Sequence, residues 1–490
     1  MVHGPRHRPR RARLRLAALG VALAAAVAAA ALATVPLGTK VRISDMGQDG
    51  QVTFGVFAGF GFPNQAVAAY NSQRDEYLVA WIADDTLDGD AEVWGRRVTA
   101  STGEPIGAKF QISDLGTGST TLGASAFDHA AVAYNSSAND YLVAWSADAP
   151  GLDNEFEIYV QKVDALGNQL GSDTRISDMG ADGSTAFNAT APAVAYNSTE
   201  NEFLVVWSGD DTTDGAFEIH GQIVNAGGMP VGSNDVRLSD MGAVDTNALF
   251  AATQPAVAYN SQANEYVVAW QGDDDTAGLV DNEFEIFMQR LTAGLGQLGT
   301  DTRISDVGGD GNATFDALTP SIAYDRAANQ YLTVWNANEG IAPLASTEEE
   351  VYGQLLSSDG TQIGVNDQRY SEMAPDGNAA FETKTPSVAF NAAANEYLVT
   401  WPGDSEPSPD GELEIYAQRV AATGAPVGSD VKVSDMGPAG NGEFDAFSGS
   451  VAASATRHEF LAVWIGEDVS GLLGDGEVEV YARRLGAEPA

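Results

Sequence analysis

The segment that decides the fold reads Pro192-Ala-Val-Ala-Tyr-Asn-Ser-Thr-Glu-Asn-Glu-Phe-Leu-Val-Val-Trp207, and Glu218-Ile-His-Gly-Gln-Ile-Val224 follows it. The part that ends in Trp207 recurs along the chain, and every copy closes on a tryptophan. The seven tryptophans lie 62 to 66 residues apart, at Trp81, Trp145, Trp207, Trp270, Trp335, Trp401 and Trp464. A fixed period of this kind is the signature of a repeat architecture.

Each copy contains four short strand-like runs separated by turn residues. In the third copy these runs are 193–196, 202–207, 218–224 and 236–239. The first run is made of small residues, as expected around a narrow axis, and the second is apolar on both faces, so neighbours must cover both. A four-stranded unit buries two apolar faces only when copies stack on one another in a ring. The sequence therefore predicts an all-β, seven-bladed β-propeller with four antiparallel strands per blade.

The chain ends test this prediction against its rivals. Immunoglobulin-like sandwiches need about 100 residues per unit, and an open solenoid needs atypical capping repeats. After residue 33, the first strand-like run is Val41 to Ser44, which resembles the fourth and outermost run of a repeat. The last run is Glu479 to Leu485, which resembles the third run of a repeat. We therefore expect the N-terminal outer strand to join the last blade and to close the ring.

Composition limits the class of partner. The chain has 490 residues, no Cys, and 25 Lys plus Arg against 68 Asp plus Glu, a net charge of −43. A field of that sign argues against nucleic acid and against an anionic membrane surface as partners. A chain of this length can bury a large core without disulfides. Adaptation to high salt is a further explanation of the charge, since the chain has only five Lys.

The first 33 residues differ from the rest. Six Arg precede an apolar run from Leu16 to Ala33, and Ala31-Leu32-Ala33 offers a small-x-small cleavage site. The sequence predicts an export signal over 1–33 and a single propeller domain over 34–490, secreted or held at the cell surface or in the periplasm. Such a domain is expected to be a monomer with no membrane span after signal removal. The export route and cleavage of the signal stay open, because Arg10-Arg11 only partly matches a twin-arginine signal and 18 apolar residues approach a membrane span.

The repeat phrases quoted above resemble those of exported bacterial β-propeller proteins, many of which have no assigned activity. The resemblance covers nearly all of residues 34–490. It implies the fold and leaves the function open, because propellers host enzymes, receptors and scaffolds alike.

The repeat also predicts where the acidic residues gather. The loops from outer to next inner strand and from second to third strand should emerge on one face, and they carry most of the carboxylates. Loops of the form Asp-x-Gly-x-Asp-Gly could wrap Ca²⁺, which takes six to eight oxygen ligands, although their third and twelfth positions do not match an EF-hand. Solvated acidic loops are the alternative. The predicted metal ligands are Asp45, Asp49, Asp178, Asp182, Asp273, Asp275, Asp281, Asp306 and Asp310.

Two further residue types recur in all seven copies. A Glu begins every third strand, and a Ser followed by an acid ends every outer strand. We expect the Ser-acid pair to cap the following turn, and the Glu to make an inter-blade hydrogen bond or an ion pair. The candidate basic partners are Arg42, Arg175, Arg237, Arg303, Arg369 and Lys432.

Functional residues are harder to predict than the fold. Phe57, Phe60 and Phe62 lie on a Gly-rich loop and are predicted either to bind a ligand or to cover the channel. No catalytic residue is predicted, because the three His after the signal occupy different repeat positions. The main functional prediction is an exported binding module with Ca²⁺ in some acidic loops and a protein or glycan ligand at the acidic face. The alternative is a carbohydrate-active hydrolase or lyase with its site at the acidic channel mouth.

Overall fold

The computed structural model of the chain describes residue 1 and residues 34–46, 55–56, 66–84, 91–114, 130–148, 155–242, 248–274, 278–339, 344–345, 347–373, 375–405, 411–438, 444–468 and 477–487. The rest of the predicted export signal lies outside the described residues. Among the residues that are described, no helix has both the length and the apolar character needed to cross a membrane.

The described chain forms seven antiparallel sheets, numbered here as blades in chain order. The strands of blades 1 to 3 are β3 (Ala66–Asn71), β4 (Glu76–Asp84), β5 (Glu92–Thr99) and β6 (Pro105–Gln111); β7 (Ala130–Asn135), β8 (Asp140–Asp148), β9 (Phe156–Asp164) and β10 (Thr174–Arg175); and β11 (Ala189–Asn197), β12 (Glu202–Gly209), β13 (Glu218–Asn225) and β14 (Pro230–Arg237). A short strand, β2 (Gly55–Val56), also pairs with β4.

Blades 4 to 7 continue the same order. Their strands are β15 (Ala252–Asn260), β16 (Glu265–Asp273), β17 (Phe284–Thr292) and β18 (Thr302–Arg303); β19 (Ala317–Asp325), β20 (Gln330–Ala337), β21 (Glu350–Ser357) and β22 (Gln362–Arg369); β23 (Ser387–Asn391), β24 (Glu396–Gly403), β25 (Glu414–Ala421) and β26 (Pro426–Lys432); and β27 (Ala446–Ala453), β28 (Glu459–Glu467) and β29 (Val478–Ala487) with β1 (Thr34–Arg42).

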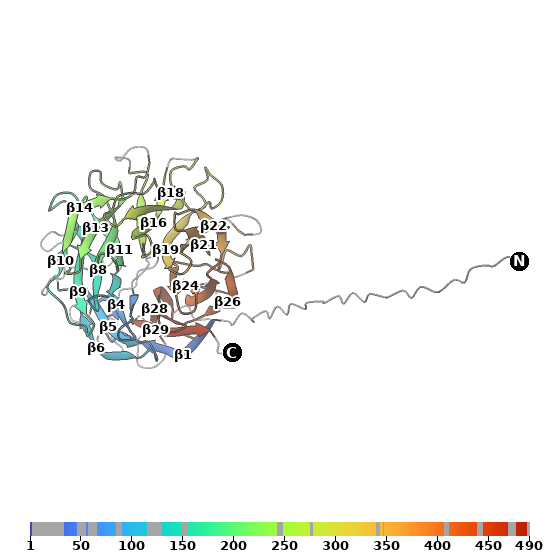
Figure 1. Cartoon of the computed structure of the whole chain (residues 1–490), viewed down its shortest axis with the longest axis horizontal. Helices are drawn as coiled ribbons and strands as arrows, with labels where there is room; N and C mark the ends of the chain where they lie inside the picture. The colour runs from blue at the N-terminus through green and yellow to red at the C-terminus, as the bar shows by residue number, and fades with distance from the viewer. Residues whose placement is uncertain are drawn as a thin grey trace. The chain divides into compact units, whose positions relative to one another are not determined.

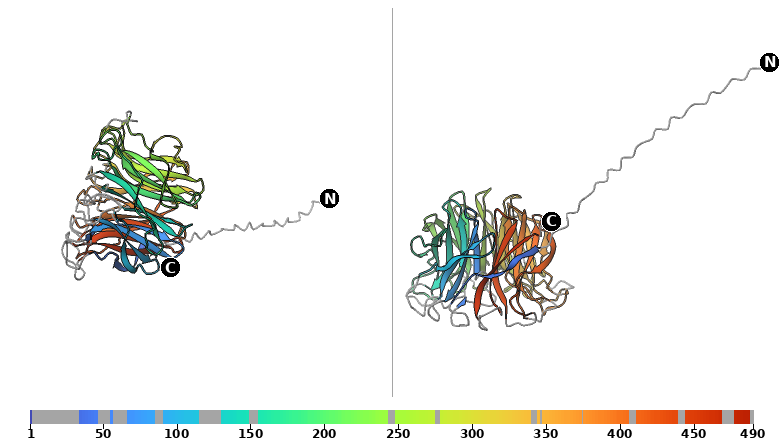
Figure 2. Two further views of the ribbon diagram at one scale, coloured as in Figure 1. Left: turned by 90° about the vertical axis from the view of Figure 1, so that its left-hand side faces the viewer. Right: turned by 90° about the horizontal axis from the view of Figure 1, so that it is seen from below.

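The blades form a closed ring around an axis (Figure 1). Each inner strand contacts the inner strand of the next blade, and β27 of the last blade contacts β3 of the first. From the side, the strands run between two faces of a thick disc (Figure 2). The prediction of an all-β, seven-bladed propeller with four antiparallel strands per blade is confirmed.

The N-terminal strand completes the last blade. Strand β1 pairs antiparallel with β29, with Val41 opposite Ala482 and Arg42 opposite Tyr481. The pairing extends back to Thr34, so the closing strand is longer than the sequence predicted. Just beyond it, the backbone N of Ile43 donates to the carbonyl of Val480 at 2.7 Å. The predicted closure is confirmed.

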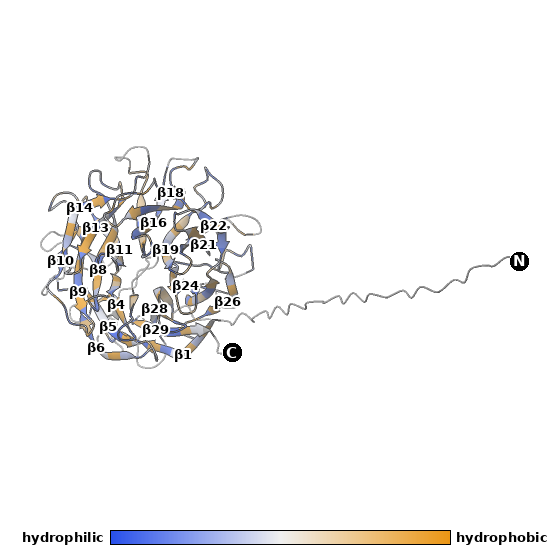
Figure 3. Cartoon of the chain, viewed as in Figure 1, coloured by the Kyte–Doolittle hydropathy of each residue, from blue (hydrophilic) through white to orange (hydrophobic). Residues whose placement is uncertain are grey.

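The core lies between the blades. Seven clusters of buried apolar side chains each join two neighbouring blades, one cluster per junction. The second-strand tryptophans are 0 to 3% exposed. Several stack on an aromatic residue of the third strand, as Trp270 does on Phe287 with ring centroids 6.5 Å apart. Hydrophobic residues accordingly follow the strands around the ring (Figure 3).

A repeated Ser-Glu contact fixes the end of each outer strand. In blade 4, Ser305 Oγ donates to the carboxylate of Glu285 and accepts from the backbone N of Ile286 at 2.7 Å. The other carboxylate oxygen of Glu285 accepts from Val307 N at 3.0 Å. Burial raises the pKa of Glu285 to about 8, although these hydrogen bonds oppose the shift.

This Ser-Glu contact joins two strands of one blade, so the predicted inter-blade bond of the Glu is wrong. The repeated Glu is close enough to the Ser because both lie at the same end of paired third and fourth strands. The predicted basic partners are confirmed in four blades, within 4.0 Å of the Glu carboxylate, at Arg42, Arg237, Arg303 and Lys432.

Removal of one hydroxyl tests this contact. We expect Ser305→Ala to lower the free energy of unfolding by about 1–3 kcal/mol, because the buried Glu285 carboxyl loses a donor and Ile286 N loses an acceptor. Urea denaturation measures the change, and Ser233→Ala at an exposed position of β14 is the control. A Ser305→Ala variant as stable as the control would contradict a stabilising role.

Candidate functional site

The antiparallel order gives the ring two different faces. The second and fourth strands of each blade end at one face, which we call the acidic face because it carries Asp178, Asp210, Asp273 and Asp306. The short turns after the first and third strands lie on the opposite face, which we call the turn face.

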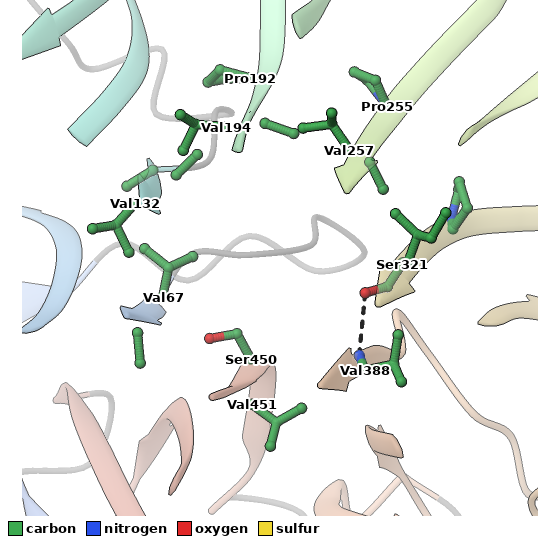
Figure 4. A pocket seen from close by; sticks show the side chains of 17 residues that line it. Val67, Val132, Pro192, Val194, Pro255, Val257, Ser321, Val388, Ser450 and Val451 are labelled. Atoms are coloured by element: carbon green, nitrogen blue, oxygen red, sulfur yellow. Dashed lines mark hydrogen bonds between the residues drawn. The ribbon is translucent and has the colours of Figure 1, made fainter. Parts of the chain in front are cut away.

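A pocket of about 230 Å³ lies on the axis between the inner strands. Aliphatic side chains surround it (Figure 4): Val67, Val132, Val194, Val257, Val388 and Val451. Pro192, Pro255 and Pro320 also line the pocket, from blades 3 to 5. Ser321 and Ser450 add two hydroxyl groups to this lining, and no charged side chain among the described residues lines the pocket.

The residues before these three prolines adopt left-handed backbone conformations. Ala191, Gln254 and Thr319 have φ of 54°, 55° and 53°, and each sits at a shift in the strand register. This conformation is unusual for a β-branched residue such as Thr319. Side chains of the preceding blade hold two of the bulges: Gln254 N donates to Ser208 Oγ at 3.0 Å and Thr319 N to Gln271 Oε1 at 2.8 Å.

In two of the loops predicted to bind Ca²⁺, both loop aspartates contact an arginine. Asp178 and Asp182 both accept hydrogen bonds from the Arg175 guanidinium, at 2.9 and 3.1 Å. Arg303 contacts Asp306 at 3.4 Å and Asp310 at 2.7 Å in the same way. The guanidinium therefore supplies the positive charge between the two loop acids. Asp45 lies 3.5 Å from Arg42.

The remaining predicted ligands are placed differently. Asp273 is buried and accepts from Asn282 N at 2.7 Å. Burial raises its pKa to about 6, and the charges of Asp281, Asp274 and Asp316 add to the shift. Asp49 and Asp275 lie outside the described residues, as do Phe57, Phe60 and Phe62.

No group of three or more His, Asp or Glu able to hold a metal occurs in the described part of the chain. Calcium binding stays a prediction. If the acidic loops bind Ca²⁺, the melting temperature should be higher in millimolar Ca²⁺ than in chelator, because ligand binding stabilises the folded state. Mg²⁺ is the control for a general ionic effect. The absence of a shift, with no bound calcium by elemental analysis, would remove the prediction.

Many other acids of this face cap loops. Asp210 accepts from Asn188 N at 2.7 Å and from Gly215 N at 2.8 Å, and so ties the second-strand loop to the start of its own inner strand. Asp404 makes the same pair of bonds in blade 6, to Glu382 N and Gly411 N. A carboxylate repeated in this way serves the scaffold, so a functional site has to be sought where the repeat is broken.

The repeat is broken at the acidic face between blades 5 and 6. Lys384 Nζ lies 2.8 Å from Glu382 Oε1 and 3.3 Å from Glu349 Oε2. Glu349 directly precedes β21, whereas Glu382 and Lys384 precede the inner strand β23. All three side chains are about one-third to one-half exposed, at 32, 44 and 33%.

Two further side chains position this group. Asn336, at the end of β20, donates to Glu349 Oε2 at 3.2 Å and to the carbonyl of Thr383 at 3.1 Å. Thr383 Oγ donates back to Asn336 Oδ1 at 2.9 Å. We call Asn336, Glu349, Glu382, Thr383 and Lys384 the blade 5/6 network.

The charge state of Lys384 follows from these contacts. Burial alone would lower the pKa of the Lys384 amine. The hydrogen bond to Glu382 and the charges of Glu349 and Glu382 outweigh burial, so the pKa rises above its ordinary value. Lys384 therefore stays an ammonium at neutral pH and holds two accessible carboxylates beside one another.

The sequence alone does not predict this network. The available signal was Lys384 itself, because the other four Lys of the chain lie on or beside third or fourth strands. The histidines do not add to the site: His458 is exposed in a turn of the turn face, and His129 lies outside the described residues. Burial lowers the pKa of His220 to about 4, which keeps this side chain neutral.

Comparisons with known proteins show what fold the chain resembles but assign it to no family. No protein-family model matches the chain, and no curated protein matches its sequence. Solved structures do match. The polysaccharide lyase Uly1 has a TM-score of 0.51 at 11% identity, over 92% of this chain and 100% of that protein.

Two other similar structures have lower scores. They are the α-L-arabinofuranosidase Arb93A of Fusarium graminearum, with a TM-score of 0.45 at 13% identity over 76% of this chain and 95% of that one, and a PL25 ulvan lyase bound to a glucuronate-rhamnose sulfate glycan, with 0.47 at 9% over 87% and 93%. At such identities the likeness is one of fold.

One match corrects the main functional prediction, which is a binding module with Ca²⁺ in its acidic loops. Uly1, which shares the fold over 92% of this chain and 100% of that protein, is a polysaccharide lyase. The likeness to Uly1 is one of fold, over nearly the whole of both chains.

Proposed function

We propose that the protein is a glycan-cleaving enzyme whose active site is the blade 5/6 network on the acidic face. The observation that carries the proposal is the pair of half-exposed carboxylates, Glu349 and Glu382, on a single ammonium, Lys384. This group departs from the sevenfold repeat, as a catalytic centre must when chemistry needs one asymmetric site. The propeller fold shared with the polysaccharide lyase Uly1 supports the same class of activity.

The two carboxylates fit glycoside hydrolysis. In that reaction one carboxyl group protonates the glycosidic oxygen, and the other attacks the sugar or activates water. Because both groups contact Lys384 Nζ, their nearest oxygens are no further apart than the sum of 2.8 and 3.3 Å. This upper limit is compatible with the separation of roughly 5–5.5 Å between the two carboxyl groups of retaining glycosidases, which is shorter than the separation in inverting ones. Lys384 acts as a positioning residue.

Electrostatics favours hydrolysis of neutral or cationic glycans over elimination from uronate glycans. A net charge of −43 repels a polyanionic chain, and elimination needs a uronate carboxylate next to the proton that is removed. Lys384 cannot take up that proton at neutral pH, because its two acidic neighbours raise its pKa and keep it an ammonium.

Activity assays on variants test the proposal. We expect turnover of a neutral glycan such as arabinan, galactan or xylan, measured as reducing ends released. Glu349→Gln and Glu382→Gln should each lower kcat by about 10²- to 10⁴-fold, the usual contribution of a general acid or base. Lys384→Met should lower kcat less than either, and Lys384→Arg should restore part of the loss.

The control is Glu104→Gln, which removes an exposed carboxylate in a turn of the turn face. If the wild-type protein releases unsaturated, ultraviolet-absorbing products from a uronate glycan, the reaction is elimination and not hydrolysis. Full activity in Glu349→Gln and Glu382→Gln would move the site away from the blade 5/6 network. If neither neutral nor uronate glycans are turned over, the proposal that the protein is a glycan-cleaving enzyme is rejected.

A further inference from the structure

The axial pocket is bounded by strand edges that pair with no other strand. In each blade the inner strand is the last strand of its sheet, so it pairs with the second strand on one side only. The pocket lies at the first residues of these inner strands, such as Pro192-Ala193-Val194 of β11. An unpaired strand edge presents backbone N–H and C=O groups that require hydrogen-bond partners. The pocket is therefore lined by polar backbone groups as well as by aliphatic side chains.

Serine side chains cap this edge in two blades. Ser321 Oγ of blade 5 accepts a hydrogen bond from the backbone N of Val388 in blade 6, at 3.2 Å (Figure 4). Ser387 Oγ of blade 6 accepts from Val451 N of blade 7 at 3.2 Å in the same way. The N–H groups of Val388 and Val451 therefore point away from the second strand of their own blade and across the junction at the axis.

The strand register gives other inner strands the same geometry. Val388 lies opposite Val399 of β24. In an antiparallel pair, a residue directs its N–H and its C=O to the same side. The residues at the same place in blades 2 to 5 therefore present both groups to the axis. They are Val132, Val194, Val257 and Ile322, which lie opposite Val143, Val205, Val268 and Thr333 and all line the pocket.

The serine cap is missing in front of these four residues. The position that Ser321 holds in blade 5 is occupied in blades 1 to 4 by Val67, Ala131, Ala193 and Ala256. None of these side chains has an acceptor atom. Val132, Val194, Val257 and Ile322 thus form an arc of backbone donors and acceptors around one side of the pocket, which we call the uncapped arc.

A buried hydroxyl adds an unsatisfied polar group on the other side. Ser450 of β27 lines the pocket and is 9% exposed. Among the residues that the structure describes, its Oγ has no hydrogen-bond partner. A buried polar group without a partner is unfavourable. A bound molecule that offers a hydroxyl would satisfy it.

We propose that the axial pocket binds one neutral sugar residue through the uncapped arc and Ser450. The choice of a sugar rests on the proposed function, in which the residue at the end of a neutral glycan occupies the pocket. A sugar hydroxyl both donates and accepts, which matches a backbone edge that presents one N–H beside one C=O.

The lining also determines the charge of the ligand. No charged side chain among the described residues lines the pocket. A charged ligand would lose its hydration there without a partner of opposite charge, which is costly. The net charge of −43 disfavours an anion further. A neutral polyhydroxyl ring is therefore the ligand that the pocket accommodates.

The size of the pocket limits the ligand to one small ring. Its volume of about 230 Å³ is below the roughly 300–1,000 Å³ of pockets that hold drug-sized ligands. Val388, which lines the pocket, follows Lys384 by four residues on one segment, so the two lie within about 14 Å of each other. A short oligosaccharide can therefore occupy the pocket and reach the blade 5/6 network.

Amide signals of protein with isotope-labelled valine test the inference, because the uncapped arc and the capped edges both contain valines. Titration with D-galactose should shift the signals of Val132, Val194 and Val257 more than those of Val388 and Val451. D-galacturonate and D-galactosamine, which carry opposite charges on the same ring, should cause smaller shifts. Unchanged signals with D-galactose, L-arabinose and D-xylose in large excess would show that the pocket holds water only and would overturn the proposal.

Added serine caps provide matched variants. Ala193→Ser and Ala256→Ser copy Ser321 and place acceptors beside two N–H groups of the uncapped arc. Together they should weaken D-galactose binding by about 2- to 10-fold, the range that one net hydrogen bond gives. Ser321→Ala uncovers the N–H of Val388 and should not weaken binding, and Ala263→Ser in an exposed turn is the control. Equal affinity in the capped variant and the control would contradict the role of the uncapped arc.

Failure of this inference can be told apart from failure of the proposed function. Glycan turnover that Glu349→Gln abolishes, with no sugar bound in the pocket, would overturn the pocket site alone. Sugar binding at the uncapped arc without turnover of any glycan would support the pocket site and reject the enzyme.

Discussion

The structure depends on the burial of both faces of the second strand. In every blade this strand carries large apolar side chains on alternate sides, and a single sheet cannot cover them. The tryptophans that end these strands are therefore buried only because a neighbouring blade packs against them. Each junction has its own apolar cluster, and closure of the ring leaves no blade with an uncovered face.

Polar groups are then arranged around this apolar requirement. The Ser-Glu contacts fasten the outer strands, and the aspartates at the second-strand ends cap the loops. Arg175 and Arg303 neutralise pairs of loop acids. Much of the acidic excess thus has a structural partner in the described loops, which is why repeated acids are a weak guide to function. Departures from the repeat, such as Lys384, carry more information.

The period of the tryptophans and the two unmatched end strands were enough to predict the blades and the closure, because both follow from one local pattern repeated along the chain. The partner of a repeated side chain was harder. The Glu of the third strand pairs within its blade, which depends on strand register rather than on residue type. The contacts of the blade 5/6 network could not be predicted from the sequence, because Asn336 and Thr383 are 47 residues apart and meet only after two blades have packed.

Closure by β1 also affects how the molecule is made. The strand that leaves the ribosome first pairs with the strand that leaves it last, as in the hydrogen bond from Arg483 to Gly38 across 445 residues. Contacts of such sequence separation form slowly, because the loop that they close costs entropy before the contact stabilises anything. During synthesis, six blades can pack in order while β1 has no partner, because β29 of the seventh blade has not yet been made. A chain that stops before β29 therefore exposes an unpaired strand edge of the kind that recruits other chains.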